Sequence, residues 1–484
     1  MKELNRTTAA VSTPFPEKVL QFGGGNFLRA FADWMLDEYN EKANTDLGVL
    51  VVSPIGKNNY VKWQEQEGLY HVLTRGFQNG EVVDEKRLIK SISRILHLFN
   101  SWEAYLKSAE NPEIRFIISN TTEAGIRFSA ADKATDTPPK EFPAKLTLWL
   151  YHRYQYFQGS SEAGCILIPV ELILKNGEAL CSCILQNIEN WELEEDFKKW
   201  ILESNIFCNT LVDRIVPGIS RDSLPEEMER IGYQDAMMTQ GEAFHFWAIE
   251  GPEQVQKELP LNEIGLNVIF TNDLTPYRTR KVRILNGAHT SMVPVGYLYG
   301  IETVREAVED EVMGRFVKKA IFDEIIPTLD LSKEELESFA NGVLDRFRNP
   351  FIKHYLISIA LNSVSKFKTR VLPSILEYQK RKEVLPPCLV FSFAALIQFY
   401  KGVHDGKEIP LKDDPNAIAF LAGVWSECDG SEEAISALIK KILKWEYAWG
   451  QDLSLIHGLQ EMLMGYLVRI EQEGIKRGIE TFLE

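Results

Sequence analysis

Three polar residues near the middle of the chain have the types and the spacing of a proton-transfer site. Lys281, Asn286 and His289 are separated by five and then three positions, which at roughly 100° per residue places them within an arc of about 140° on one helix. A lysine can accept a proton, an asparagine can donate a neutral hydrogen bond, and a histidine can donate or relay a proton. Oxidation of a secondary alcohol by hydride transfer needs such a base, together with donors for the oxygen that becomes a carbonyl.

A β-hairpin is the alternative to a helix at this place. Asn286-Gly287 between apolar, β-branched stretches is typical of a two-residue hairpin turn, which would leave the three polar side chains without a common face. A helix is favoured because Leu285 and Ala288 then take packing positions, and Pro294 falls late enough to end or kink the helix. We therefore expect a helix that presents the three residues together.

The neighbours of Lys281 bear on its use as a base. Arg280 and Arg283, together with burial, would favour the neutral form of the lysine. Taken alone, a lysine and a histidine on one helix are more often a solvated charge and a satisfied histidine. Tyr277 lies four positions before Lys281, as in short-chain dehydrogenases, but in those proteins the pair lies inside a single Rossmann domain, so we take the spacing as a coincidence.

A glycine turn near the start of the chain is a candidate cradle for a dinucleotide. The apolar stretch 18–22 runs into Gly23-Gly24-Gly25 and then into a segment with helical spacing. Such a turn lets backbone N–H groups approach a pyrophosphate at an electropositive helix start. Leu28 occupies the place of the third glycine, so the motif alone fits a turn in another α/β protein equally well. The residues expected to bind the cofactor here are Val19, Leu20, Gln21, Phe22, Gly23, Gly24, Gly25, Asn26, Phe27, Leu28, Arg29 and Ala30.

Further apolar runs predict the strands of a buried parallel sheet. They lie at residues 48–54, 115–119, 165–170 and 266–273, and most are nearly continuous in hydrophobic residues, as in strands that are covered on both faces. The run at 48–54 ends without an Asp or Glu for a ribose hydroxyl, so the residues do not decide between NAD and NADP.

Polar residues follow two of these runs, where ligands gather in open α/β sheets. Thr121, Thr122 and Glu123 follow the run at 115–119, and Glu171 and then Asn176 follow the run at 165–170. Turn and cap chemistry is the commoner explanation for such residues. We take the first three as candidates for contact with the cofactor.

The pattern changes along the chain from mixed to helical. Helical spacing dominates between about 185 and 265, with an interruption at 208–218, and Pro276 is expected to break the chain just before Lys281. Beyond that point the pattern is helical to the end. We expect an α/β Rossmann-type domain at residues 1–275, followed by a mainly α-helical domain at residues 276–484.

Composition limits the classes of partner. The 484 residues carry a formal net charge of -16, which argues against nucleic acid and anionic membranes as partners, because both select cationic surfaces. Six scattered cysteines and eight scattered histidines form no recognised zinc or redox motif, so we expect reduced thiols and no metal. No signal core or apolar run long enough to span a membrane is present, which favours a cytoplasmic protein. The sequence does not indicate an oligomeric state.

Several separated motifs carry a resemblance over essentially the whole length. They are residues 21–31, 119–126, 211–216, 281–289 and 346–350. On these the chain resembles the polyol-specific long-chain dehydrogenases, the mannitol dehydrogenase family. The resemblance implies a Rossmann-type domain followed by a mainly helical domain, and zinc-independent catalysis with NAD. Through the pattern Lys-x4-Asn-x2-His, it also implies that Lys281 is the general base and that Asn286 and His289 polarise and position the carbonyl.

Departures from the family pattern point to the substrate. Arg278 stands where the polyol enzymes commonly carry a glutamate, and Glu171-Leu172 stands where they have Asp-Asn, so Asn176 is the nearest substitute for a second oxyanion asparagine. An arginine beside the site suits a carboxylate, which it can bind through two hydrogen bonds. A hexuronate is thus favoured over a neutral polyol.

A second group of basic residues follows the shared motif at 346–350. Surface charge balanced by nearby glutamates is the commoner explanation for any one of them, but together they could close a pocket on the acid end of a substrate. With Lys366, Lys368 and Arg370 beyond them, the candidate substrate residues are Asn176, Asp213, Arg278, Arg346, Arg348, Lys353 and His354.

These expectations combine into one activity with two alternatives. The favoured activity is reversible, NADH-dependent reduction of the keto group of D-tagaturonate to D-altronate in hexuronate catabolism. Within the same family, a fructuronate/mannonate or mannitol oxidoreductase is the alternative. A nucleotide-sensing protein without turnover is an alternative of another class, because a fold does not fix a function.

Overall fold

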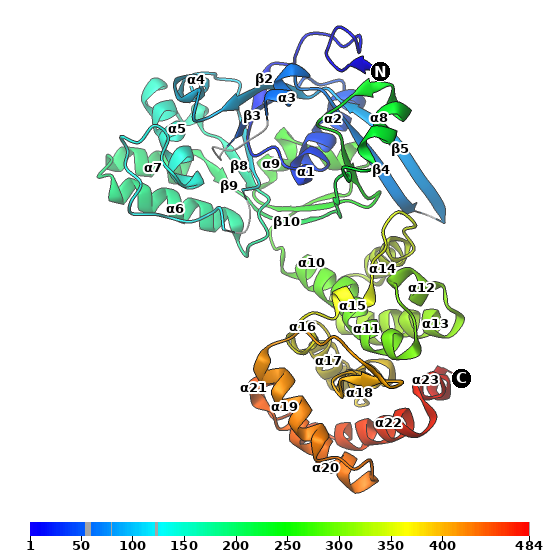
Figure 1. The fold of residues 1–484 in the computed structure, drawn as a ribbon. Helices are drawn as coiled ribbons and strands as arrows, with labels where there is room; N and C mark the ends of the chain where they lie inside the picture. Colours follow the sequence, from blue (N-terminus) through cyan, green and yellow to red (C-terminus); the bar gives the residue numbers. More distant parts are fainter. Residues whose placement is uncertain (54–59, 79, 122–123, 484) are drawn as a thin grey trace. The chain divides into compact units, whose positions relative to one another are not determined.

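The computed structural model describes residues 1–53, 60–78, 80–121 and 124–483. The chain divides into two compact units (Figure 1). Unit 1 comprises Met1–Gly76 and Val82–Leu274, and unit 2 comprises Phe77–Glu81 and Thr275–Glu484. Each unit is described by itself below.

A six-stranded parallel sheet forms the centre of unit 1. Its strand order is β6-β3-β2-β7-β8-β9, which in order of appearance along the chain is the 3-2-1-4-5-6 arrangement of dinucleotide-binding domains. The order reverses between β2 and β7, and the crevice beyond the strand ends at that point is where such domains bind their ligand. The strands are β2 Glu17–Phe22, β3 Gly48–Ser53, β6 Ile92–His97, β7 Phe116–Ser119, β8 Ile166–Pro169 and β9 Ile206–Phe207.

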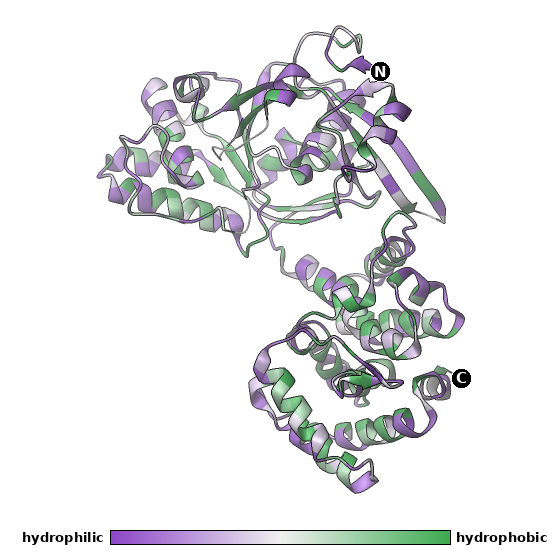
Figure 2. Cartoon of the chain, in the orientation of Figure 1, coloured by the Kyte–Doolittle hydropathy of each residue, from purple (hydrophilic) through white to green (hydrophobic). Residues whose placement is uncertain are grey.

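Alternating side chains of β2 supply two separate cores, one on each face of the sheet. Val19 belongs to one core, whereas Leu20 and Phe22 belong to the other. Strands buried on both faces are apolar throughout, which is why these runs stand out in the sequence and in the hydrophobic colouring of Figure 2. The helices that connect the strands of this sheet region are α1 Asn26–Arg29, α2 Ala32–Ala43, α3 Val61–Glu65, α4 Trp102–Ser108, α5 Phe142–Tyr156, η1 Ser161–Ala163, α6 Asn176–Asn190 and α7 Glu195–Ser204.

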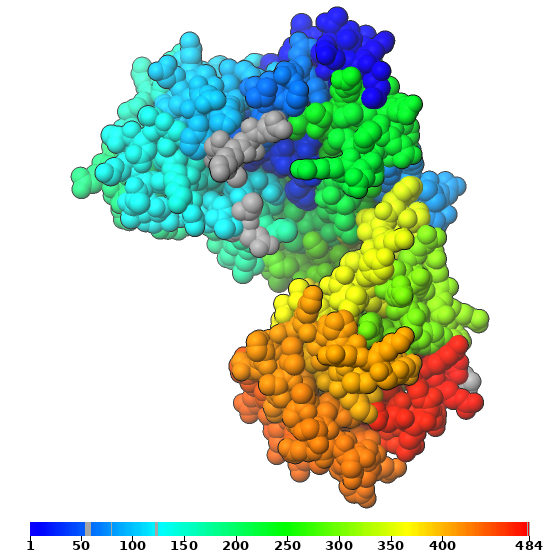
Figure 3. Space-filling model, in the orientation of Figure 1, coloured from blue at the N-terminus to red at the C-terminus, as the bar shows by residue number. Residues whose placement is uncertain are grey.

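Smaller sheets join the first hundred residues to the segment after residue 200. The pairs are β12 with β4 and β1 with β11, and on the face shown in Figure 3 the two segments, blue and green, lie side by side within unit 1. The remaining elements, all in unit 1 except the last two residues of β4 and the first residue of β5, are β1 Lys2–Glu3, β4 Tyr70–Gln78, β5 Glu81–Ile89, β10 Asn209–Asp213, α8 Leu224–Ile231, β11 Tyr233–Gln234, β12 Thr239–Gly241, β13 Phe246–Glu250, α9 Glu253–Glu258, η2 Leu261–Ile264 and β14 Val268–Thr271.

The expectation of mainly helical structure between 185 and 265 is wrong for much of that range. Antiparallel β10 and β13, with β14 parallel to β13, form a three-stranded sheet there. Residues 246–249 are buried on both faces, and a short, fully buried apolar run has no alternation to distinguish a strand from a helix. The last strand, expected at 266–273, is present as β14.

Unit 2 is helical around one apolar helix. All but the first of the thirteen residues of α18 are buried, and α18 packs against α11 and α22. Its elements are α10 Thr275–Arg280, η3 Lys281–Asn286, α11 Gly287–Tyr299, α12 Val304–Glu309, α13 Glu311–Lys319, η4 Ala320–Ile325, η5 Ile326–Thr328, α14 Lys333–Phe347, α15 Leu356–Ile359, α16 Ser363–Arg370, α17 Leu372–Lys382, α18 Pro387–Phe399, β15 Val403–His404, β16 Lys407–Glu408, α19 Pro415–Ser426, α20 Glu432–Leu443, α21 Glu446–Trp449, η6 Leu453–Leu455, α22 Leu459–Glu473 and α23 Ile475–Leu483.

The segment that carries Lys281 is helical, as expected, and not a hairpin. α10, η3 and α11 follow one another without a break, and η3 is a π-helix. The expectation that Pro276 breaks the chain is wrong. It lies in the first turn of α10, where a missing N–H costs no helical hydrogen bond. Pro294 does not end α11, which continues to Tyr299.

None of the helices in the described ranges is both long enough and apolar enough to cross a membrane. All six cysteines are free thiols.

Candidate active site

The glycine turn of unit 1 has the backbone geometry of a phosphate cradle. Gly23 has φ +106°, a conformation that side chains rarely adopt, and a Cβ on Gly24 would lie 2.5 Å from Trp63 and 2.8 Å from the Tyr60 hydroxyl. Gly25 directly precedes α1, and a Cβ there would meet no atom within 4 Å. The turn is therefore closed on its protein side and open at the helix start, which fits a dinucleotide pyrophosphate.

Side chains next to the turn hold its shape. Arg29 is buried, and its guanidinium donates to the carbonyls of Gly24 and Met237 and to Asn26 Oδ1. Asn26 Oδ1 also accepts from Thr239. The Asn26 carboxamide oxygen and the Arg29 guanidinium are thus bound to protein atoms, and in this conformation both residues brace the turn.

The other residues expected at the cofactor divide by burial. Phe27 is half-buried. Six of these residues are buried and support the turn from the protein interior; they are Val19, Leu20, Gln21, Phe22, Leu28 and Ala30. The groups left to meet a ligand are the backbone atoms of Gly23 to Gly25 and the start of α1.

Beyond β7 and β8, a buried carboxylate ties the strand ends together. Glu171 accepts hydrogen bonds from Ser119 Oγ at 3.0 Å and from both the backbone N–H and the hydroxyl of Thr121 at 2.9 Å. Burial raises the pKa of the Glu171 carboxyl, and the bonds from Thr121 and Ser119 oppose that rise. Thr121 lies at the switch point of the sheet, as a cofactor contact requires. Thr122 and Glu123 lie outside the described residues.

Asn176 does not present its side chain to a ligand in this structure. It is fully buried, and its Nδ2 donates to the carbonyls of Pro169 and Glu171 and to the Thr210 hydroxyl. Its Oδ1 accepts from Gly177 and Thr210 N–H groups. The amide joins the end of β8 to β10 and is saturated with protein partners, so in this conformation it has no N–H left to donate to an oxyanion.

Asp213 closes β10 and is buried, opposite Phe246 on the neighbouring strand. The next residue, Arg214, donates to the carbonyls of Ala30 and Glu242 and lies over the Trp34 ring at 4.3 Å. The shared motif at 211–216 therefore holds the junction between α1 and α2. No signal in the sequence indicated this role.

The three candidate catalytic residues of unit 2 lie on one continuous helix. Lys281 opens η3, Asn286 ends it, and His289 is in the first turn of α11. All three are half-buried. Because a π turn holds more residues than an α turn, the angle between Lys281 and Asn286 is smaller than α-helical spacing implies. π turns of this kind are frequent at functional sites.

The two arginines beside Lys281 in the sequence, Arg280 and Arg283, make their polar contacts with residues of other helices. Arg280 is buried, pairs with Glu335 and lies over the rings of Tyr277 and Phe339. Arg283 donates to the Ser374 hydroxyl at 2.7 Å. Both side chains fasten this helix to the helices around it, and each has its own polar partner.

His289 lies among basic residues drawn from three other parts of unit 2. Its ring centroid is 4.3 Å from that of Phe347 and 5.1 Å from that of His354. Burial lowers the pKa of His289 well below its usual value, and the nearby His354, Arg346, Arg370 and Lys366 lower it further. Its Nε2 is shielded from solvent and has no hydrogen-bond partner among the described residues. A neutral imidazole with such a nitrogen can bind an oxygen that the protein does not supply.

The structure separates the expected substrate residues into two sets. Arg346, at the end of α14, and His354 both lower the pKa of His289. The backbone carbonyl of His354 accepts a hydrogen bond from the N–H of Val304. Arg348 instead pairs with Asp345 at 3.4 Å, and Lys353 is exposed.

Lys366 and Arg370 were recognised in the sequence only as nearby charge. Their spacing of four residues on α16, which puts them on one face of the helix, was the signal that could have added them to the site. Arg278 is half-buried on α10, in the helical turn before Lys281.

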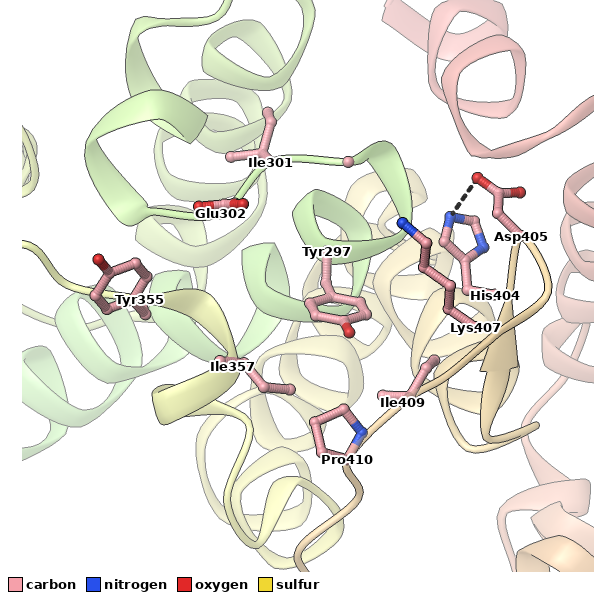
Figure 4. Close-up of a pocket in the computed structure, with 11 residues that line it drawn as sticks. Tyr297, Ile301, Glu302, Tyr355, Ile357, His404, Asp405, Lys407, Ile409 and Pro410 are labelled. Carbon is pink, nitrogen blue, oxygen red and sulfur yellow. Dashed lines mark ion pairs between the residues drawn. The ribbon is translucent and has the colours of Figure 1, made fainter.

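A hollow of about 450 Å³ lies elsewhere in unit 2, between the end of α11, the start of α15 and the β15–β16 hairpin (Figure 4). Tyr297, Tyr355, Ile357 and Lys407 line it, and the His404 ring faces Asp405 at 3.6 Å. None of the expected site residues lines this hollow. No cluster of His, Cys, Asp and Glu suited to a metal ion is found in the part of the chain that the structure describes.

Comparison with known proteins agrees with this architecture. The chain matches the family model of the mannitol dehydrogenase Rossmann domain over residues 17–263 and that of the mannitol dehydrogenase C-terminal domain over residues 273–468. An altronate oxidoreductase of Bacillus subtilis (strain 168) is 48% identical over 100% of this chain and 98% of its own length. An altronate oxidoreductase of Klebsiella pneumoniae (strain 342) is 44% identical over 99% of each chain.

Two solved structures share the fold. A D-sorbitol dehydrogenase in substrate-free form has a TM-score of 0.79 at 21% identity, covering 99% of this chain and 100% of its own. The Pseudomonas fluorescens mannitol 2-dehydrogenase, in a ternary complex with NAD and D-mannitol, has a TM-score of 0.63 at 20% identity, covering 100% of this chain and 99% of its own. With both family models matched and full-length relatives at 44–48% identity, the chain belongs to the mannitol dehydrogenase family.

Proposed function

We propose that this dehydrogenase catalyses the reversible, NAD-dependent interconversion of D-tagaturonate and D-altronate. The full-length relatives named altronate oxidoreductase support this substrate pair, and the family resemblance supports NAD over NADP. Residues 1–275 form the cofactor domain in this proposal, and residues 276–484 form the substrate domain. The expected partner is a small sugar acid, with neither nucleic acid nor membrane involved.

The surroundings of His289 are the observation that carries the proposal. In a chain with net charge -16, the main charges that act on this imidazole are basic: Arg346, Arg370 and Lys366, with the neutral His354 ring beside them. A cationic cluster in an acidic protein attracts an anionic ligand to that place. A neutral polyol gains nothing from such a cluster, whereas a sugar acid does.

Lys281, Asn286 and His289 would carry out the proton chemistry. During alcohol oxidation, Lys281 accepts the hydroxyl proton as the C–H hydride leaves the same carbon, and in the reverse direction it returns that proton to the oxygen. Asn286 donates a hydrogen bond to the oxygen, and neutral His289 can donate one from its protonated ring nitrogen. When bound, the nicotinamide supplies the hydride acceptor or donor.

The cofactor would be held by the glycine turn. Gly23, Gly24 and Gly25 would present backbone groups and the start of α1 to the pyrophosphate, while Arg29 keeps the turn in shape. Thr121, held by Glu171 at the switch point, would lie near the nicotinamide. Thr122 and Glu123, which are outside the described residues, are proposed as further cofactor contacts from the sequence.

A panel of substrates tests the activity. We expect the purified protein to show its highest kcat/KM with D-tagaturonate and NADH, and a lower value when NADPH replaces NADH. A higher value with D-fructuronate would instead identify a fructuronate/mannonate oxidoreductase, and a higher value with a neutral keto sugar would identify a polyol enzyme. NADH binding without turnover of any of these compounds would identify a nucleotide-sensing protein.

A further inference from the structure

Arg370 ends α16 directly beside the helix that carries His289. Its carbonyl oxygen is 3.1 Å from the position that a Cβ would occupy on Gly287. Because any side chain at 287 would press on this carbonyl, glycine lets the end of α16 approach the first turn of α11. Arg370 thus lies next to the residue that follows Asn286, two positions before His289.

The charge of Arg370 is felt at the proposed site, because it lowers the pKa of both His289 and Lys366. The side chain is half-buried, and within the described ranges no carboxylate forms an ion pair with it. A guanidinium withdrawn from water without an acid partner gains most from an anionic ligand, because the ligand replaces the lost hydration with charge-assisted hydrogen bonds.

The other basic residues nearby have partners or lie apart. Arg348 pairs with Asp345, and Lys353 is exposed. Lys366 donates to the carbonyl of Ile359 at 2.8 Å and is also influenced by Asp413.

Arg346 and Arg278 are less suited than Arg370 to bind a carboxylate. Arg346 is buried and has a further interaction within the protein. Arg278 lies on α10 and is not among the main charges that act on His289.

We propose that Arg370 binds the carboxylate of the substrate and sets the preference for a sugar acid over a neutral sugar. This inference rests on the proposed function and names the residue responsible for its substrate class. Two guanidinium N–H groups donate to the two carboxylate oxygens, which fixes the acid end of the substrate while Lys281, Asn286 and His289 act on the reacting oxygen.

Arg370→Leu tests this assignment, with Arg370→Lys as the conservative variant and Arg305→Leu as the control. Arg305 is an exposed arginine of unit 2 that pairs with Glu309 along α12. We expect Arg370→Leu to raise the KM for D-tagaturonate by about 10-fold to 100-fold, the loss typical of a charged hydrogen-bonding partner. Its kcat/KM for a neutral keto sugar should stay within about twofold of wild type, so that the ratio of acid to neutral specificity falls. Arg370→Lys should give an intermediate ratio, because it keeps the charge but loses the two-point geometry.

Two results would overturn the assignment: an unchanged ratio, or equal losses for acid and neutral sugars, which would mark Arg370 as structural. Calorimetric titration of D-altronate separates this inference from the proposed activity. Weaker D-altronate binding in Arg370→Leu supports the carboxylate contact even if D-tagaturonate is not reduced. Equal binding to wild type and variant overturns the contact even if it is.

Discussion

The imidazole rings of His289 and His354 lie with their centroids 5.1 Å apart and their planes at 76°. Burial lowers the pKa of both rings, and for His289 the surrounding basic residues add to the effect of burial. The site is therefore arranged to keep two adjacent imidazoles neutral. Only a neutral imidazole leaves one ring nitrogen to donate and the other to accept a hydrogen bond.

Acid should destabilise the protein through His289. Its folded-state pKa lies below the unfolded value of about 6.5, so below that pH the unfolded chain binds more protons and stability falls. The expected loss is up to about 1.4 kcal/mol for each pH unit below 6.5, until the folded-state pKa is reached. Denaturant unfolding of wild type and His289→Gln between pH 8 and pH 5 measures it. The variant should lose less stability than wild type on acidification. Parallel curves of unfolding free energy against pH for wild type and His289→Gln would contradict a lowered pKa of His289 in the folded protein.

The buried carboxyl of Asp33 should lower the stability of the protein as pH rises, whereas His289 lowers it as pH falls. It is fully buried in α2, its Oδ1 has no hydrogen-bond partner among the described residues, and the Tyr70 hydroxyl that reaches its Oδ2 at 3.0 Å also faces the carbonyl of Arg29. Burial is the main cause that raises its pKa to about 7. The folded state then binds the extra proton between about pH 4 and pH 7, so this carboxyl lowers stability as pH rises through that window, by about 1.4 kcal/mol per unit.

Asp33→Asn, which resembles the protonated acid, should remove this decline. The measurement is unfolding free energy against pH for wild type and variant, whose difference should grow up to about pH 7 and then stay level. Asp37→Asn is the comparison in the same helix, because burial raises the pKa of Asp37 too, whereas its carboxylate accepts hydrogen bonds from Arg87, Lys90 and Ser91. It should destabilise the protein at neutral pH. A constant difference between wild type and Asp33→Asn would show that Asp33 is ionised throughout.

How far the sequence predicts the fold depends on burial. Strands β3, β7 and β8 are almost entirely apolar and β2 has an apolar centre, so these four strands of the sheet around the glycine turn were predicted correctly. Strand β5 was not, because eight of its nine residues are exposed or half-buried and charged residues dominate its middle, a composition as typical of a helix surface. Strand β9 has two residues, which is too short for any pattern to register.

The same contrast holds for the candidate site. Lys281, Asn286 and His289 share one helix, so their grouping follows from spacing alone. The basic cluster instead comes from residues 346–370, which begin more than fifty positions after His289. The sequence alone cannot tell Arg346, which lowers the pKa of His289, from Arg348, which pairs with Asp345. Only the folded structure distinguishes the two arginines, because it fixes where α14 ends and how the chain then turns toward α16.

Removal of the proposed base should separate chemistry from cofactor binding. We expect Lys281→Ala to lower kcat by about 10²-fold to 10⁴-fold, the usual contribution of a general base. The dissociation constant for NADH should remain close to that of wild type, since the glycine turn lies in unit 1. Lys333→Ala, at an exposed lysine of α14, should change neither quantity. In the wild type, alcohol oxidation should also accelerate as pH rises, and the variant should lack this rise. Equal losses of turnover and NADH binding would indicate a structural lysine.

The glycine turn offers a matched pair of substitutions for the cofactor. Gly24→Ala should destabilise unit 1 by about 1–3 kcal/mol, because the new Cβ would fall 2.5 Å from Trp63 and 2.8 Å from the Tyr60 hydroxyl and the packed rings would have to move. Gly25→Ala should leave stability within about 0.5 kcal/mol of wild type, since φ is -68° and no atom lies within 4 Å of the new Cβ. If the pyrophosphate lies against this open side, Gly25→Ala should still weaken NADH binding by at least about tenfold, because the methyl group would occupy the space that the phosphate needs. Fluorescence titration of NADH, beside thermal unfolding of both variants, distinguishes the two effects. Unchanged NADH affinity in a stable Gly25→Ala protein would show that the dinucleotide is held elsewhere.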